Sequence, residues 1–175
     1  DGGDLFYTQE RSGKDGKTFK LYKLRTMKAS SQEYVFPNLP EDPRVTKVGK
    51  IIRPFGIDDF PQLMINMLIK GDMSLFGIRA LATPQYQELI NLHKTHPELF
   101  SEELVIEWKR AYDSAAPGGL SLAMARGRSS LNLDYEGLRK KMEYDIEYNE
   151  KASLFYDFWI LKETIVAFLR SRGTW

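Results

Sequence analysis

The chain has 175 residues, a formal net charge of +1 and no cysteine. This length is enough for one domain with a hydrophobic core, so we expect a single domain over residues 1–175. The near-neutral charge gives no basic footprint for nucleic acid, and the lack of cysteine excludes disulfides and thiolate metal sites. No stretch of the sequence approaches the ~18 consecutive apolar residues of a membrane-spanning helix.

Two segments near the N-terminus predict a β-hairpin. Residues 5–9 and 19–24 are rich in aromatic side chains and partly alternate between apolar and polar positions. Residues 11–17 between them contain two glycines and favour a turn. Residues 29–43, with three prolines and two adjacent serines, predict a surface loop.

The middle of the chain predicts helices separated by short extended segments. Residues 61–69 are apolar on nearly every side, which indicates a buried helix that ends at Gly71. Residues 73–78 favour a short extended segment before Arg79. Further helices are expected over 84–92, over 101–112 and from a cap at Asp134 to about Tyr148, with a break at 117–119.

The last predicted helix covers residues 153–170 and has a wide apolar stripe. The stripe has helical spacing and consists of Leu154, Phe158, Leu161, Ile165, Phe168 and Leu169. Such a stripe is typical of a packed core, but beside Lys162 it also suits a membrane interface, and the pattern leaves both interpretations open. Together these elements predict an α+β fold, a helix-rich single domain with a short N-terminal β-hairpin.

Residues 14–28 carry six basic side chains interleaved with Phe19 and Tyr22. This ribbon could attract a diphosphate, an anionic membrane or RNA. A solvated face of the hairpin is the plainer interpretation. The overall charge disfavours nucleic acid as the partner.

Two adjacent carboxylates, Asp58 and Asp59, are the strongest chemical signal. Arg53 lies shortly before them, and Pro61 opens the apolar run after them. An ionised Asp beside a guanidinium suits a nucleophile or a metal ligand in phosphate chemistry. Asp is also a favoured helix cap, so capping is an alternative role for the pair.

Several blocks of the chain, in order, resemble the bacterial sugar transferases of the monotopic phosphoglycosyl transferase family. They read DGGDLFYTQERSGKDGKTFK at residues 1–20, LYKLRTM at 21–27, RVTKVGKIIR at 44–53, DDFPQL at 58–63 and KGDMSLFGIR at 70–79. Pro117-Gly118, Gly127-Arg128 and residues 145–148 and 153–164 resemble the C-terminal part of the family. The resemblance covers essentially the whole chain.

This resemblance implies transfer of a sugar-1-phosphate from a nucleotide diphosphate sugar, typically a UDP-sugar, to polyprenol phosphate. It implies a phosphosugar intermediate on an Asp, Mg²⁺ as cofactor, and a role in initiating exopolysaccharide or glycoconjugate synthesis. The implied location is the cytoplasmic face of the bacterial inner membrane. Family members carry an N-terminal re-entrant membrane helix, which we expect this stretch of sequence to lack. The oligomeric state does not follow from the resemblance.

The family pattern also implies roles for particular residues. Asp58 matches the nucleophile and Asp59 the metal ligand. The guanidiniums of Arg53 and Arg79 would lower the repulsion between the carboxylates and a diphosphate, so we assign these two arginines as phosphate binders and Arg128 as a further candidate.

The chain departs from the family pattern at this same place. The family pair is Asp-Glu, whereas this chain has Asp58-Asp59. The helix after the pair carries two more residues in this chain than in the family pattern before the Lys70-Gly71 motif. The other departures are Ile78-Arg79-Ala80 for Pro-Arg-Pro, Pro117-Gly-Gly-Leu-Ser121 for Pro-Gly-aliphatic-Thr-Gly, and Met124 for a Gln. An inactive relative that binds a nucleotide sugar, or serves in assembly or regulation, is therefore the alternative function.

Overall fold

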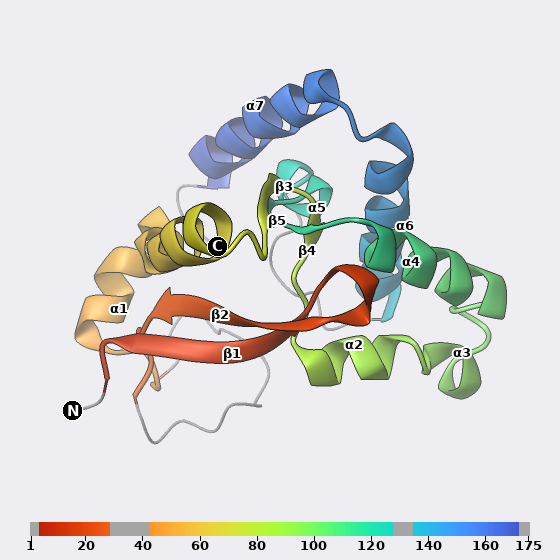
Figure 1. Ribbon diagram of the computed structural model, residues 1–175, viewed down its shortest axis with the longest axis horizontal. Coiled ribbons are helices and arrows are strands. Elements are labelled where there is room, and N and C mark those ends of the chain that lie inside the picture. The colour runs from red at the N-terminus through yellow and green to blue at the C-terminus, as the bar shows by residue number, and fades with distance from the viewer. Residues whose placement is uncertain (1–3, 29–42, 128–134, 172–175) are drawn as a thin grey trace.

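The structure of the protein is a computed structural model that describes residues 4–28, 43–127 and 135–171 (Figure 1). It combines two small sheets with many helices, which confirms the α+β, helix-rich prediction. The elements are β1 (Phe6–Ser12), η1 (Lys14–Gly16), β2 (Thr18–Leu24), α1 (Lys47–Ile52), η2 (Arg53–Phe55), η3 (Ile57–Asp59), η4 (Gln62–Ile69), β3 (Ser74–Phe76), β4 (Ile78–Arg79), α2 (Thr83–Leu89), α3 (Leu92–Thr95), α4 (Glu102–Ser114), β5 (Pro117–Leu120), α5 (Leu122–Ala125), α6 (Tyr135–Lys151) and α7 (Leu154–Ser171). The predicted loop at 29–43 lies almost wholly outside the described residues, and the expected cap at Asp134 is also outside them.

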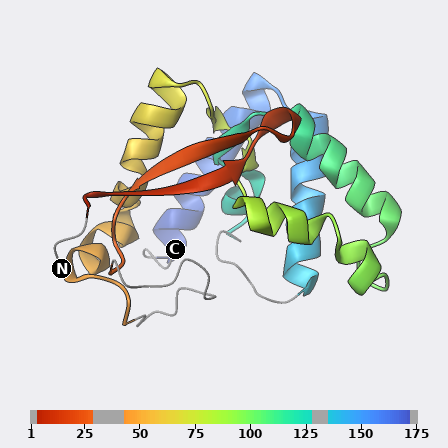
Figure 2. The ribbon, with the colours of Figure 1, turned by 60° about the horizontal axis from the view of Figure 1, so that its bottom comes forward.

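The N-terminal hairpin forms as predicted. β1 and β2 pair antiparallel, from Phe6 opposite Leu24 to Ser12 opposite Thr18. The connecting turn contains Asp15 with a φ of 58° and Gly16 with a φ of 69°. Figure 2 shows the hairpin lying across the molecule, with α1 and η4 toward one end and α2 and α4 toward the other.

A three-stranded sheet lies at the centre, in the order β3-β5-β4 with both neighbours parallel to β5. β3 and β4 follow each other directly, so the chain crosses β5 at Gly77, whose N–H donates to the carbonyl of Leu120 at 3.0 Å. A Cβ atom on Gly118 would overlap the backbone of Phe76 and Gly77. The predicted interruption of the helices at 117–119 is confirmed, but the sequence did not predict the strand there, in which these small residues permit the crossing.

The main core lies between the sheet and the C-terminal helices. Trp108 of α4, Phe100 and Ile160 of α7 are completely buried within it. The ring centroids of Trp108 and Tyr112 are 5.2 Å apart. The Tyr112 hydroxyl donates to the carbonyl of Ser12 and accepts from the N–H of Leu81, both at 2.9 Å, and so joins the hairpin to the core.

η4 is a π-helix, in which the N–H of Lys70 donates to the carbonyl of Ile65 at 2.9 Å. Each π-helical turn holds about one residue more than an α-helical turn, which is the kind of local change that can absorb extra residues in a helix. The prediction that this helix is buried is wrong. η4 contacts β2 and β3 along one side, whereas the exposed fraction of Leu68 is 73% and that of Ile69 is 75%.

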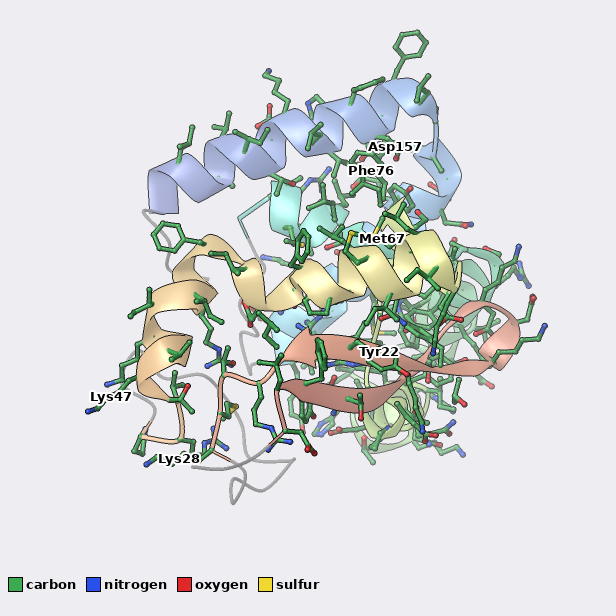
Figure 3. The ribbon with its side chains drawn as sticks, turned by 60° about the vertical axis from the view of Figure 1, so that its left-hand side comes forward. Tyr22, Lys28, Lys47, Met67, Phe76 and Asp157 are labelled. Atoms are coloured by element: carbon green, nitrogen blue, oxygen red, sulfur yellow. The ribbon has the colours of Figure 1, made fainter. Side chains whose placement is uncertain are left out.

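Asn66 is the completely buried residue of η4. Its Oδ1 accepts from the backbone N–H of Tyr22 at 3.1 Å, and its Nδ2 donates to the carbonyl of Lys20 at 2.7 Å. The same amide donates to Asp72 Oδ2 at 3.2 Å. Figure 3 shows η4 above the hairpin strand that carries Tyr22. Asn66 thus holds the strand, the helix and the turn after the helix together.

α7 exposes most of its predicted apolar stripe. Ile160 and Thr164 are buried, whereas Leu154, Phe155, Phe158, Ile165 and Leu169 are exposed. Figure 1 shows α7 along one border of the molecule. The stripe is therefore not a core-facing surface within the described part of the chain.

The crossing at Gly118 gives a test of the fold. We expect Gly118→Ala to lower the free energy of unfolding by more than about 3 kcal/mol, because the new methyl group must displace two backbone segments. Gly119→Ala is the matched control, since a Cβ there meets its nearest heavy atom at 3.6 Å. We expect it to change stability by less than about 1 kcal/mol. Denaturant titration followed by circular dichroism measures both, and equal losses would contradict the crossing.

Candidate active site

The two carboxylates lie on η3, one turn of helix that comes after a sharp change in chain direction. Gly56 has a φ of 64°, in the left-handed region that favours glycine, and it joins η2 to η3. This turn returns the chain so that Arg53 and Asp58 interact electrostatically. The residue capping η4 is Pro61, with no side-chain hydrogen bond to the helix, so the capping role considered for Asp58 and Asp59 is not observed.

Lys23 of β2 forms an ion pair with Asp59. Its Nζ lies 2.6 Å from Asp59 Oδ1, and both side chains are partly exposed. β2 contacts both η3 and η4, so the position of the lysine depends on how the hairpin packs against these helices. The sequence placed Lys23 in the basic ribbon at 14–28 without distinguishing it from its neighbours.

The surroundings of Asp58 act on its pKa in opposite directions. Burial is the largest effect and raises the pKa, and the adjacent charge of Asp59 raises it further. Lys23 and Arg53 lower it, and the net result is a pKa above the ordinary aspartate value. A cation-lined carboxylate whose basicity is increased in this way suits nucleophilic attack on phosphorus.

Arg79 belongs to a second charged cluster. It ends β4, and its electrostatic partners are Asp145 of α6 and Tyr112 of α4. Burial lowers the pKa of Arg79, and Asp145 opposes that shift. Asp145 Oδ2 accepts from Trp108 Nε1 at 3.0 Å. The described interactions thus bring Arg53 to the paired carboxylates but place Arg79 with Asp145.

Burial also raises the pKa of Asp145, to about 7, against the lowering effects of Trp108 and Arg79. Sequence reasoning matched residues 145–148 to the C-terminal part of the family without giving Asp145 a role. Arg128, the remaining predicted phosphate-binding residue, lies outside the described residues.

The donor set at η3 is small for a metal ion. In the described part of the chain, no group of three or more acidic or histidine side chains could hold a metal by itself. Mg²⁺ is commonly held by one or two carboxylates together with substrate phosphates. Asp58 and Asp59 fit an ion shared with a diphosphate, and the charge repulsion between them would be relieved by it.

The charges around Asp58 predict the direction of two pKa changes. Asp59→Asn removes a like charge and should lower the pKa of Asp58, whereas Lys23→Met removes a cation and should raise it. Carboxyl-carbon NMR titration measures both shifts. Asp157→Asn, on α7, is the control and should leave the Asp58 titration unchanged. Shifts with the opposite signs would contradict this electrostatic description.

Comparison with known proteins gives the chain its relatives. A family model described as bacterial sugar transferase matches residues 1–171. The exopolysaccharide production protein ExoY of Sinorhizobium fredii is 30% identical over 191 residues, which cover 100% of this chain and 74% of that protein. The UDP-glucose:undecaprenyl-phosphate glucose-1-phosphate transferase of Caulobacter vibrioides is 33% identical over 171 residues, 95% of this chain and 57% of the relative.

The galactosyl transferase CpsE of Streptococcus agalactiae is 28% identical over 185 residues, which cover 99% of this chain and 36% of that protein. The chain therefore spans about a third to three quarters of the length of these relatives. The match of the family model over nearly every residue agrees with the motif order found in the sequence. The chain belongs to the bacterial sugar transferase family, a family of transferase enzymes.

Proposed function

We propose that residues 1–175 form one sugar transferase domain that moves a sugar-1-phosphate from a nucleotide diphosphate sugar, a UDP-sugar, to polyprenol phosphate. The product would start exopolysaccharide or glycoconjugate synthesis. The observation that carries the proposal is the adjacent pair Asp58-Asp59 with Lys23 2.6 Å from Asp59 and Arg53 acting on Asp58. The activity for which the Caulobacter relative is named supports the choice of donor and acceptor.

In the proposed reaction, a carboxylate oxygen of Asp58 attacks the phosphorus that bears the sugar. The bond from this phosphorus to the bridging oxygen breaks, and nucleoside monophosphate leaves with that oxygen. A phosphate oxygen of the lipid then attacks the same phosphorus, and the bond to Asp58 breaks. The carboxylate is regenerated and no proton is consumed, so the site needs cations rather than a general base.

Lys23 and Arg53 supply the fixed positive charge for this reaction. An anionic diphosphate is repelled by two carboxylates, and the two cations oppose that repulsion. They also oppose the rise in the pKa of Asp58, and so favour the ionised nucleophile. Asp59, together with diphosphate oxygens, would hold Mg²⁺, which when bound supplies further neutralisation of phosphate charge.

Access to a lipid substrate is supported by the apolar surface around η3. Large hydrophobic side chains of α1, η2, η3 and η4, and of Phe60 between the last two, are exposed: Val48, Ile51, Phe55, Ile57, Phe60, Leu63, Met64, Leu68 and Ile69. The exposed Lys47, Lys50 and Lys70 lie on the same segments. Apolar groups among lysines are typical of proteins that bind an anionic membrane surface. Within the described ranges, no helix has the length and apolar content needed to cross a bilayer.

We propose that the protein acts at the cytoplasmic face of the bacterial inner membrane, where polyprenol phosphate and nucleotide sugars meet. The motif departures favour a second candidate, an inactive relative that binds a nucleotide sugar. Asp59 stands where the family has Glu, and it is paired with Lys23. Detection of a covalent phosphosugar on the protein distinguishes the two candidates.

The chemistry is tested by mass spectrometry of the intact protein after incubation with UDP-glucose and Mg²⁺. We expect a mass increase of one sugar phosphate on the native chain and none on Asp58→Asn. Nucleoside monophosphate release should fall at least about 1,000-fold in that variant, since no other group replaces the nucleophile. Asp157→Asn is the control and should retain the adduct. Binding of UDP-glucose with neither adduct nor release would instead support the inactive relative.

Membrane contact is tested by flotation with vesicles that contain anionic lipid. We expect Phe55→Glu combined with Leu68→Glu to weaken vesicle binding about ten-fold, because each charge must enter the apolar interface. Ile106→Glu is the matched control, since Ile106 is 51% exposed but lies on α4. An equal loss in this control would contradict the assignment of the membrane-facing surface.

A further inference from the structure

One edge of β2 is covered by a side chain of η4 instead of by a strand. The N–H of Arg25 donates to the carbonyl of Leu5 at 2.9 Å. Bonds of an antiparallel pair recur at every second residue, so the even-numbered residues of β2 turn their backbone groups away from β1. The carbonyl of Lys20 and the N–H of Tyr22 are two such groups, and both bond to the Asn66 amide, at 2.7 Å and 3.1 Å.

The neighbours of Asn66 fix which way round its amide lies. Its Oδ1 faces a donor, whereas its Nδ2 faces two acceptors, the carbonyl of Lys20 and Asp72 Oδ2 at 3.2 Å. A flipped amide would set its NH₂ group against the N–H of Tyr22 and its oxygen against a carbonyl and a carboxylate. Asn66 is completely buried, so water does not replace these partners. The contact therefore has one arrangement.

The apolar part of the same contact does not set the register of β2 by itself. Leu21 of β2 packs with Met73 and Ala80 in a small core, and Met67 of η4 packs against it. Apolar packing is non-directional, and a strand displaced by two residues presents the same face to its neighbour. The two backbone bonds of Asn66 select one of these positions.

The register decides where Lys23 lies. Lys23 is two residues beyond Leu21, so both side chains leave β2 on the same face. Its Nζ lies 2.6 Å from Asp59 Oδ1. A slip of one residue would move the lysine about 3.3 Å along the strand and turn its side chain to the opposite face. The place of this ammonium group at the paired carboxylates thus depends on the bonds that Asn66 makes.

We propose that Asn66 is a positioning residue, which holds β2 in the register that presents Lys23 to the diphosphate of the nucleotide sugar. This inference rests on the proposed function, in which Lys23 supplies fixed positive charge. Asn66 acts through the strand and does not touch the substrate. Because the strand is held before the substrate arrives, less conformational freedom is lost on binding.

A purely structural role for Asn66 is the competing explanation. It predicts that loss of the amide reduces the fraction of folded protein, which lowers the number of binding sites in a titration but leaves their Kd unchanged. A positioning role predicts a higher Kd, and only while Lys23 is present. A double-mutant cycle of the two residues separates these explanations.

The cycle combines Asn66→Ala with Lys23→Met in the full chain, in an Asp58→Asn background that forms no covalent adduct. Isothermal titration calorimetry with UDP-glucose and Mg²⁺ measures both the Kd and the number of sites. We expect Asn66→Ala to raise the Kd about ten-fold when Lys23 is present and less than about two-fold in Lys23→Met.

Tyr148→Phe is the matched control. Tyr148 is also buried, and its hydroxyl donates to Asp157 Oδ1 at 3.1 Å, between α6 and α7. This substitution removes a hydrogen bond of a buried side chain without touching β2, so it should leave the Kd for UDP-glucose unchanged.

Asp72→Ala tests the same contact without a cavity beneath β2. Asp72 is partly exposed, and its loss removes one of the two acceptors that orient the Asn66 amide. We expect the Kd to rise about three-fold when Lys23 is present and to stay unchanged in Lys23→Met.

The outcomes separate this inference from the proposed function. An unchanged Kd in Asn66→Ala, or an equal rise in both Lys23 backgrounds, would overturn the positioning role and leave the transferase proposal intact. If Asn66→Ala does not fold, Asp72→Ala decides by the same criterion. Failure of the Asp58→Asn parent to bind UDP-glucose would overturn both.

Discussion

One buried amide, that of Asn66, fixes the geometry of the candidate site. Its two hydrogen bonds to the backbone of β2 hold the hairpin against η4. Lys23 is the next residue along that strand from Tyr22, and Asp59 lies just before the helix. The 2.6 Å pairing of Lys23 with Asp59 therefore depends on the register that Asn66 sets. An apolar side chain at this position would leave a strand N–H and a strand carbonyl without partners, at a cost of about 1–3 kcal/mol each.

The central sheet supports the second charged cluster in a different way. Gly77 and Gly118 let two backbone segments cross at close range, and this crossing sets where Arg79 leaves the sheet. The two clusters thus have separate supports, a hydrogen-bonded amide for one and backbone contact for the other.

Local patterns predicted those elements whose signals are local. The hairpin, α4, α6 and α7 followed from alternation, capping and helical spacing. The strand β5 did not, because Pro117-Gly118-Gly119 has poor strand propensity and is a strand only where another segment passes close to it. The apolar run at 61–69 indicated burial, but a run that is apolar all round does not show which elements will cover it. Asp58, Asp59 and Arg53 were found because they are neighbours in the sequence, whereas Lys23 joins them only through the tertiary contact between β2 and η3.

The departures from the family pattern differ in what they change. The two extra residues after the paired carboxylates fall in the segment that forms the π-helix, and the turn after this helix is bonded to it, since the N–H of Asp72 donates to the carbonyl of Asn66 at 2.8 Å. The replacement of the family Glu by Asp59 is a chemical change. The shorter side chain holds its negative charge about 1.5 Å closer to its own backbone. Lys23 offsets that charge directly, and its flexible four-carbon stem lets the ammonium group move from Asp59 to an incoming phosphate. Asp and Glu carry the same charge, so the departure at position 59 changes where the charge lies and not its sign, and under the proposed function Lys23 is the side chain that faces it.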